Sequence, residues 1–66
     1  MNIQLNGQGT PVTAAITIGD LIREKGLDPA TIVVEHNLAI LSAADWDQII
    51  LEENDALEII RFVGGG

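Results

Sequence analysis

Hydrophobic and polar residues alternate at the start of the chain, where apolar side chains occupy positions 1, 3 and 5. This period of two is typical of a strand with one buried face. Asn6 and Gly7 follow directly, and both residue types tolerate the positive φ of a tight hairpin turn. We therefore predict a hairpin whose second strand covers residues 10–14. Pro11 lies within that strand and indicates a sheet edge, because it has no amide hydrogen to donate.

The pattern becomes helical after residue 16. Thr17 is a natural N-cap, and Asp20 stands three residues later in an arrangement close to a capping box. Apolar residues at positions 18, 21 and 22 form a single stripe of the kind that packs against a sheet. Lys25 suits the last helical turn, and Gly26 can adopt the left-handed conformation that often ends a helix. We predict one main helix between Thr17 and Gly26.

The second half of the chain contains further apolar runs. Residues 32–35 are rich in β-branched side chains and predict a central strand. A tight turn at 36–37 leads to a short strand at 38–41, and one helical or 3₁₀ turn is expected to hold Trp46. The last and longest strand is expected at residues 56–63.

This order of elements favours an α+β fold, a mixed sheet of four to five strands with one main helix packed across one face. If the first and last strands are central and parallel, the fold is the ubiquitin-like β-grasp arrangement. A helix on a sheet of different strand order would fit the same elements, because sequence patterns place elements better than they order strands.

The last predicted strand has two different faces. Leu57 fits the buried face, and alternation from it places Glu58, Ile60 and Phe62 on the outward face. Outward apolar residues are explained either by partner docking or by ordinary cross-strand packing, and the nearby terminal glycines favour docking. Arg61 either pairs with an acidic group of a partner or acts as a local counter-charge. We assign Glu58, Ile60, Arg61 and Phe62 to partner docking.

Composition limits the possible partners. The chain has 66 residues and a formal net charge of -7, from ten acidic residues against three lysines and arginines. Nucleic acid and anionic membranes are poor partners for such a chain, and a basic protein surface is a better one. The acidity is equally explained by solubility alone. No apolar run is long enough to span a membrane, and no secretory signal follows Met1, so we expect a cytoplasmic protein.

Candidates for catalysis are weak. Cysteine is absent, so neither a disulfide nor a thiolate metal site is available. His36 is the only histidine, and no nucleophile or carboxylate pair accompanies it. Gly7 and Gly9 lack the helix and lysine of a phosphate-binding loop. We therefore expect a protein that is not itself an enzyme and that binds no metal and no cofactor.

The chain ends in Gly64, Gly65 and Gly66, directly after the last apolar run. Glycine has no Cβ and a wide range of backbone angles, so such a tail can enter a narrow enzyme active site. The alternative is a frayed chain end. We predict a β-grasp domain at residues 1–63 and a flexible glycine tail at 64–66, with the Gly66 carboxylate as a chemical handle.

Several segments together resemble the bacterial sulfur carrier protein of thiamine biosynthesis, the ThiS family of ubiquitin-like β-grasp proteins. They are residues 1–7, the helix start at 17–22, the strand and turn at 32–37, and the last strand from 54–60. The most specific feature is the continuation of that strand into residues 62–66. The resemblance covers essentially the whole chain.

The resemblance implies a mechanism and a set of partners. An E1-like adenylyltransferase would use MgATP, bound by that enzyme, to adenylate the Gly66 carboxylate. A sulfur donor such as a cysteine desulfurase would convert the adenylate to a thiocarboxylate, and thiazole synthase would accept the sulfur. Gly64 and Gly65 would thread the partner's active site. One alternative is the small subunit of molybdopterin synthase, which also carries sulfur on a terminal Gly-Gly but is usually longer. The other is a non-catalytic, protein-binding β-grasp module.

Overall fold

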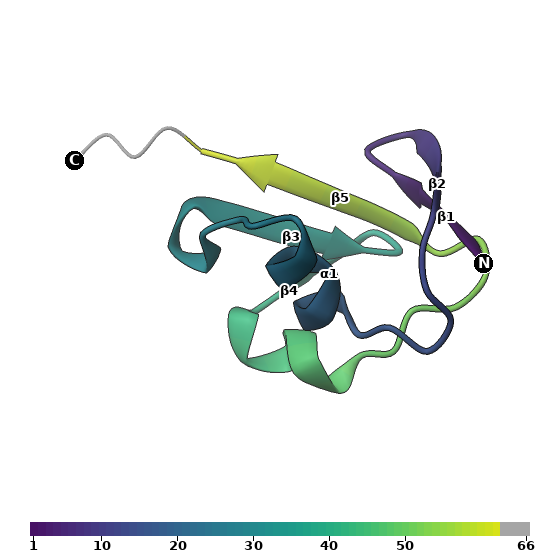
Figure 1. The fold of residues 1–66 in the computed structure, drawn as a ribbon. Helices are drawn as coiled ribbons and strands as arrows, with labels where there is room; N and C mark the ends of the chain where they lie inside the picture. Colours follow the sequence, from purple (N-terminus) through teal and green to yellow (C-terminus); the bar gives the residue numbers. More distant parts are fainter. Residues whose placement is uncertain (63–66) are drawn as a thin grey trace.

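A computed structural model describes residues 1–62 of the chain. Five strands, one α-helix and two 3₁₀ helices follow one another along these residues (Figure 1). In chain order they are β1 (Asn2–Leu5), β2 (Gln8–Pro11), α1 (Ile18–Glu24), η1 (Pro29–Thr31), β3 (Ile32–His36), β4 (Ala39–Leu41), η2 (Ala43–Gln48) and β5 (Ala56–Arg61).

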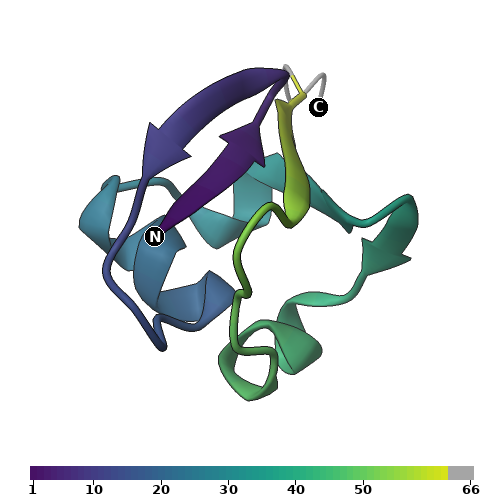
Figure 2. The same cartoon turned by 90° about the vertical axis from the view of Figure 1, so that its right-hand side faces the viewer.

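The strands form one mixed sheet in the order β2-β1-β5-β3-β4. β1 and β5 are parallel neighbours, and the other three pairings are antiparallel. α1 lies on one side of this sheet and η2 lies against α1 (Figures 1 and 2). The predicted α+β architecture is confirmed. The first and last strands are parallel and lie inside the sheet, which meets the condition set by the sequence analysis for a β-grasp arrangement.

The first hairpin differs from the prediction in where its second strand begins. Asn6 and Gly7 have φ of 50° and 81°, so both take the positive values of a two-residue turn. Because the turn contains only these two residues, Leu5 pairs directly with Gln8. The second strand is thus Gln8–Pro11 rather than residues 10–14, although its position at the sheet edge agrees with the prediction from Pro11.

Both ends of the helix agree with the prediction. The Thr17 hydroxyl accepts a hydrogen bond from the Asp20 amide at 3.0 Å, and the Asp20 carboxylate accepts one from the Thr17 amide at 3.4 Å. Together they complete the capping box. Gly26 follows the Lys25 C-cap with a φ of 66°, a conformation that glycine adopts without the strain a Cβ would bring.

The core lies between the sheet and the helix. Its buried members are almost all aliphatic, with one aromatic side chain from η2: Ile3, Ile16, Ile18, Leu21, Ile22, Ile32, Val34, Trp46, Leu51 and Leu57. Their burial is the main stabilising contribution to so small a domain.

β5 lies at the centre of the sheet, between β1 and β3. It is the longest strand of the described part of the chain, as predicted, and it ends at Arg61, at the opposite end of the sheet from Met1 (Figure 1). Val63 and the predicted boundary between domain and tail lie outside the described residues. No helix within residues 1–62 has the length and apolar character needed to cross a membrane.

Candidate functional site

The two faces of β5 are as the sequence predicts. Leu57 is fully buried and Ile59 is half-buried against the core, whereas Ile60 is 51% exposed and Phe62 is 46% exposed. Glu58 is also exposed. Because β5 is central, its outward side chains lie in the middle of the open sheet face rather than at its margin. Apolar residues at such a position are candidates for partner contact.

Neighbouring strands extend this surface beyond the predicted residues. Val33 on β3 pairs with Ile60, and Ile40 on β4, which is 74% exposed, pairs with Glu35 of β3. We call the four apolar side chains that β3, β4, β5 and the residue directly after β5 present here the outer apolar face: Val33, Ile40, Ile60 and Phe62.

The sequence prediction missed Val33 and Ile40. Alternation places Val33 on the face opposite the buried Ile32 and Val34, and Ile40 on the face opposite the half-buried Leu41, so the signal for an outward direction was present. Alternation does not give the register that places Val33 beside Ile60 of β5 and Ile40 beside Glu35 of β3, because that register depends on pairing between distant segments.

Two carboxylates lie next to the outer apolar face. Glu35 and Glu58 are direct cross-strand partners in the β3–β5 ladder. Like charges at facing positions destabilise a sheet, and a cationic group of a partner would relieve that repulsion. The structure therefore brings the predicted docking residues Glu58, Ile60 and Phe62 together on one face, with a local negative charge beside them.

Arg61 does not join the other predicted docking residues. It pairs with the buried Ile32 in the β3 register and follows Leu57 and Ile59 on the helix side of β5. Adjacent residues of a strand point to opposite faces, so Arg61 is separated from Ile60 and Phe62 by the sheet itself.

A network of polar side chains joins the turn after β3 to the start of β5, at the end of β5 opposite Phe62. Nε2 of His36 lies 2.8 Å from Oδ2 of Asp55, and the Asn37 side-chain amide donates to Oδ1 of Asp55 at 3.2 Å. The Glu52 amide donates to Oδ2 of Asp55 at 3.0 Å. His36 is thus the half-buried partner of a buried carboxylate, an interaction that its isolated position in the sequence did not indicate.

This network changes the acidity of Asp55. Burial is the largest single influence on its pKa and raises it, because a carboxylate loses solvation. The hydrogen bonds from His36, the Glu52 amide and Asn37 together outweigh burial and hold the pKa below the ordinary 3.8. We interpret the network as a connection between β3 and β5 that holds the strand pairing, since it contains no nucleophile.

On the helix side, Arg23 connects α1 to η2. Its guanidinium donates to the Asp20 carboxylate at 2.8 Å and to the Asp47 carboxylate at 2.9 Å. The hydrogen bond from Arg23 is the main reason that the pKa of Asp20 lies below its ordinary value. Gly19 permits this approach, because a Cβ there would overlap the Asp47 carboxylate. All three charged side chains are more than half exposed, so these ion pairs contribute little to stability.

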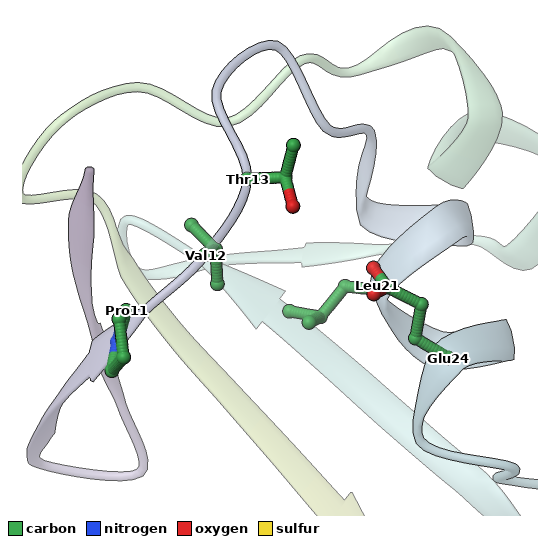
Figure 3. A pocket seen from close by; sticks show the side chains of 5 residues that line it. All are labelled: Pro11, Val12, Thr13, Leu21 and Glu24. Atoms are coloured by element: carbon green, nitrogen blue, oxygen red, sulfur yellow. The ribbon is translucent and has the colours of Figure 1, made fainter.

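The helix side also carries shallow hollows. One, of about 290 Å³, lies between the segment after β2 and α1, where Val12 and Leu21 face one another (Figure 3). Thr13 and Glu24 are its polar members, and they include no cation to hold a phosphate or a carboxylate. Within residues 1–62 no three histidine or acidic side chains gather as they would around a metal ion.

The predicted reactive group and its tail, Gly66 with Gly64 and Gly65, lie outside the described residues. Their assignment therefore stays a prediction from the sequence. Phe62 is the last described residue, belongs to the outer apolar face and precedes the glycines in the sequence.

Comparison with known proteins identifies the family. The model of the ThiS family matches residues 3–66. The chain belongs to the ThiS family. Within the ThiS family, the sulfur carrier protein ThiS of Bacillus subtilis is 34% identical over 65 residues, which cover 97% of this chain and 98% of that protein. The resemblance seen in the sequence is thus confirmed.

Solved structures agree with the ThiS fold. The crystal structure of the thiamine biosynthesis protein ThiS from Geobacter metallireducens superimposes with a TM-score of 0.84 at 28% identity, and the match covers 100% of both chains. The ubiquitin-like β-grasp prediction is therefore confirmed.

Longer proteins also contain a ThiS-like segment. A thiazole synthase from Magnetococcus marinus and one from Paramagnetospirillum magneticum are each 35% identical to this chain over 66 residues. The chain spans only 20% of the length of these two relatives.

Proposed function

We propose that this chain is a sulfur carrier protein that supplies sulfur for the thiazole ring of thiamine. The observation that carries the proposal is an exposed apolar face on the central strand that leads into three terminal glycines, in a chain of the ThiS family. The chain acts as a protein substrate of other enzymes and not as an enzyme. We place it in the cytoplasm, because the first step of the proposed route consumes ATP.

The chemistry begins at the carboxylate of Gly66. An α-carboxyl group has a pKa of about 3.3 to 3.7 and is ionised at neutral pH. Its oxygen attacks the α-phosphate of MgATP held by an E1-like adenylyltransferase, and pyrophosphate leaves. The resulting acyl-adenylate has AMP as a good leaving group, which a free carboxylate lacks. The outer sulfur of a persulfide on a donor such as a cysteine desulfurase then displaces AMP at the acyl carbon and forms an acyl disulfide. A second thiol attacks the donor's sulfur in that disulfide, so that a disulfide forms between the two thiols and the thiocarboxylate is released.

Docking positions the tail for both enzymes. The outer apolar face would bury Ile60 and Phe62 against a partner, and a basic side chain of the partner would pair with Glu35 and Glu58. Gly64 and Gly65 then extend into a narrow channel, where side chains would clash. The body of the protein provides recognition and the tail provides reactivity.

Thiazole synthase is the proposed acceptor of the sulfur. Two relatives named thiazole synthase contain a segment similar to this chain within a longer polypeptide. A carrier and its acceptor that are joined in one chain need no separate encounter, which supports a direct interaction between the two proteins. No feature of residues 1–62 favours molybdopterin synthase over this route.

Intact-mass spectrometry tests the proposal. The purified chain is incubated with the activating enzyme, MgATP and a sulfur donor, and we expect the mass change that corresponds to replacement of one oxygen by sulfur. A variant that lacks Gly66 should remain folded and show no conversion. An unchanged mass under conditions that convert the Bacillus subtilis carrier would refute the proposal.

A further inference from the structure

A second surface lies on the helix side of β5, on the face opposite the outer apolar face. A hollow of about 370 Å³ opens there, beside the last residues of β5. Its apolar lining consists of four aliphatic side chains from β1, the segment after α1, β3 and β5: Leu5, Leu27, Ile32 and Ile59. The remaining lining residues are Asn6, Lys25 and Arg61. We call this site the cationic hollow.

The cationic hollow gathers two of the three lysines and arginines of the chain. Lys25 is the C-cap of α1 and Arg61 is the last residue of β5, so distant parts of the sequence supply the two charges. The third cation, Arg23, is already paired with two carboxylates. Among residues 1–62, neither Lys25 nor Arg61 forms an ion pair with a carboxylate. In a chain with ten acidic residues, this convergence makes a local positive site on an acidic molecule.

One wall of the hollow is held in place by two hydrogen bonds between a side chain and the backbone. β1 ends at Leu5, and the Asn6 side chain takes over the pairing with β5. Its carbonyl oxygen accepts from the Ile59 amide at 2.8 Å, and its amide donates to the Ile59 carbonyl at 3.3 Å. These two bonds fix Asn6 against β5, so the site exists before any partner arrives. A preformed site loses less conformational entropy on binding.

We propose that the cationic hollow binds a short segment of a partner protein in which an acidic residue adjoins an apolar one. The aliphatic lining buries the apolar side chain, and Lys25 and Arg61 pair with the carboxylate. A small anion would leave the aliphatic lining uncovered. A second copy of this chain would bring another net charge of -7 against the first, which opposes association.

Such a segment would hold β5 from its second face. The partner would contact Ile60 and Phe62 on one side and Arg61 on the other, just before the glycines begin. Contacts on both faces of the strand end fix its direction more firmly than contacts on one face. That the partner is an enzyme acting on the tail rests on the proposed function, whereas the binding chemistry of the hollow does not.

Nuclear magnetic resonance titration tests the inference without any enzyme. The ¹⁵N-labelled full chain is titrated with the acetylated, amidated tripeptide Leu-Glu-Leu and, as a matched control, with Leu-Gln-Leu. We expect saturable shifts of the amides of Asn6, Leu27 and Arg61 with the acidic peptide. Because the neutral peptide forms no ion pair with Lys25 or Arg61, it should bind roughly fivefold more weakly.

Variants of the cations sharpen the test. The double variant with Lys25→Gln and Arg61→Gln should lose the preference for the acidic peptide. Arg23→Gln removes one positive charge outside the hollow and should keep that preference, as should the charge-preserving pair Lys25→Arg and Arg61→Lys. The pair Lys25→Arg and Arg61→Lys changes both side chains and keeps both charges, so it separates a loss of charge from a loss of structure.

Four outcomes would overturn the inference. They are the absence of saturable shifts, equal binding of the two peptides, shifts of the same amides by sodium phosphate with similar affinity, and a dimer in sedimentation experiments that the double variant abolishes. The thiocarboxylate assay on the unmodified chain reports on the proposed function separately, so failure of one idea is distinguishable from failure of the other.

Discussion

Ile60→Ala separates the docking role of the outer apolar face from a role in folding. Ile60 is 51% exposed, so the folded chain buries about half of its side chain. The substitution removes three carbon atoms, worth about 0.8 kcal/mol each when fully buried, or about 2.4 kcal/mol together. We therefore expect the free energy of unfolding to fall by about 1.2 kcal/mol. The exposed half, buried only on docking, leaves about 1.2 kcal/mol for the partner, or about an eightfold rise in Kd.

Urea denaturation measures the first quantity, and calorimetric titration with the activating enzyme measures the second. Ile50→Ala is the matched control, because Ile50 is 58% exposed and lies outside the outer apolar face. It should lose similar stability and keep the Kd of the unmodified chain. A fall of several kcal/mol in unfolding free energy with an unchanged Kd would show that Ile60 serves the core and would refute the reasoning. Equal weakening of binding by both variants would also contradict it.

Three further predictions concern stability. Because folding lowers the pKa of Asp55, this carboxylate stabilises the protein above its ordinary pKa of 3.8, and the stabilisation is lost as the pH falls through the lower pKa of the folded state. In Asp55→Asn the urea midpoint should therefore fall less steeply as the pH is lowered below 3.8. An equally steep fall in the variant and the unmodified chain would contradict this. Asn6→Ala removes two hydrogen bonds from the backbone of Ile59, so the free energy of unfolding measured by urea denaturation should fall by about 2 kcal/mol and hydrogen exchange at the Ile59 amide should become faster. Unchanged exchange would exclude the role given to Asn6. Thr17→Ala removes the N-cap of α1 and should lower stability by about 1 kcal/mol, while Thr17→Ser should keep most of it; equal effects would mean that the hydroxyl is not the cause.

The sequence predicts the local elements well because their causes are local. Positive φ at Asn6 and Gly7 follows from residue type, as does the capping box at Thr17 and Asp20. The prediction is wrong where the start of a strand depends on its pairing with another strand. The second strand begins at Gln8 because the two-residue turn sets the register, and that register was not visible in the apolar pattern of 10–14.

The sequence predicts only part of the docking surface. Alternation alone identifies Ile60 and Phe62 as outward residues, and the structure agrees. The same alternation separates Arg61 from them, although nearness in sequence led us to group the three. Val33 and Ile40 join the surface only through the pairing of β3 with its neighbours, which no local pattern contains.

The sequence by itself determined the turns, the helix ends, the two faces of the last strand and the resemblance to the ThiS family. Each of these depends on residues that are close along the chain, where backbone angles and side-chain spacing decide the outcome. Only the tertiary structure decided the partnership of His36 with Asp55 and the meeting of Lys25 with Arg61 around one hollow. These contacts join distant segments, and their geometry is set by strand register and core packing acting together.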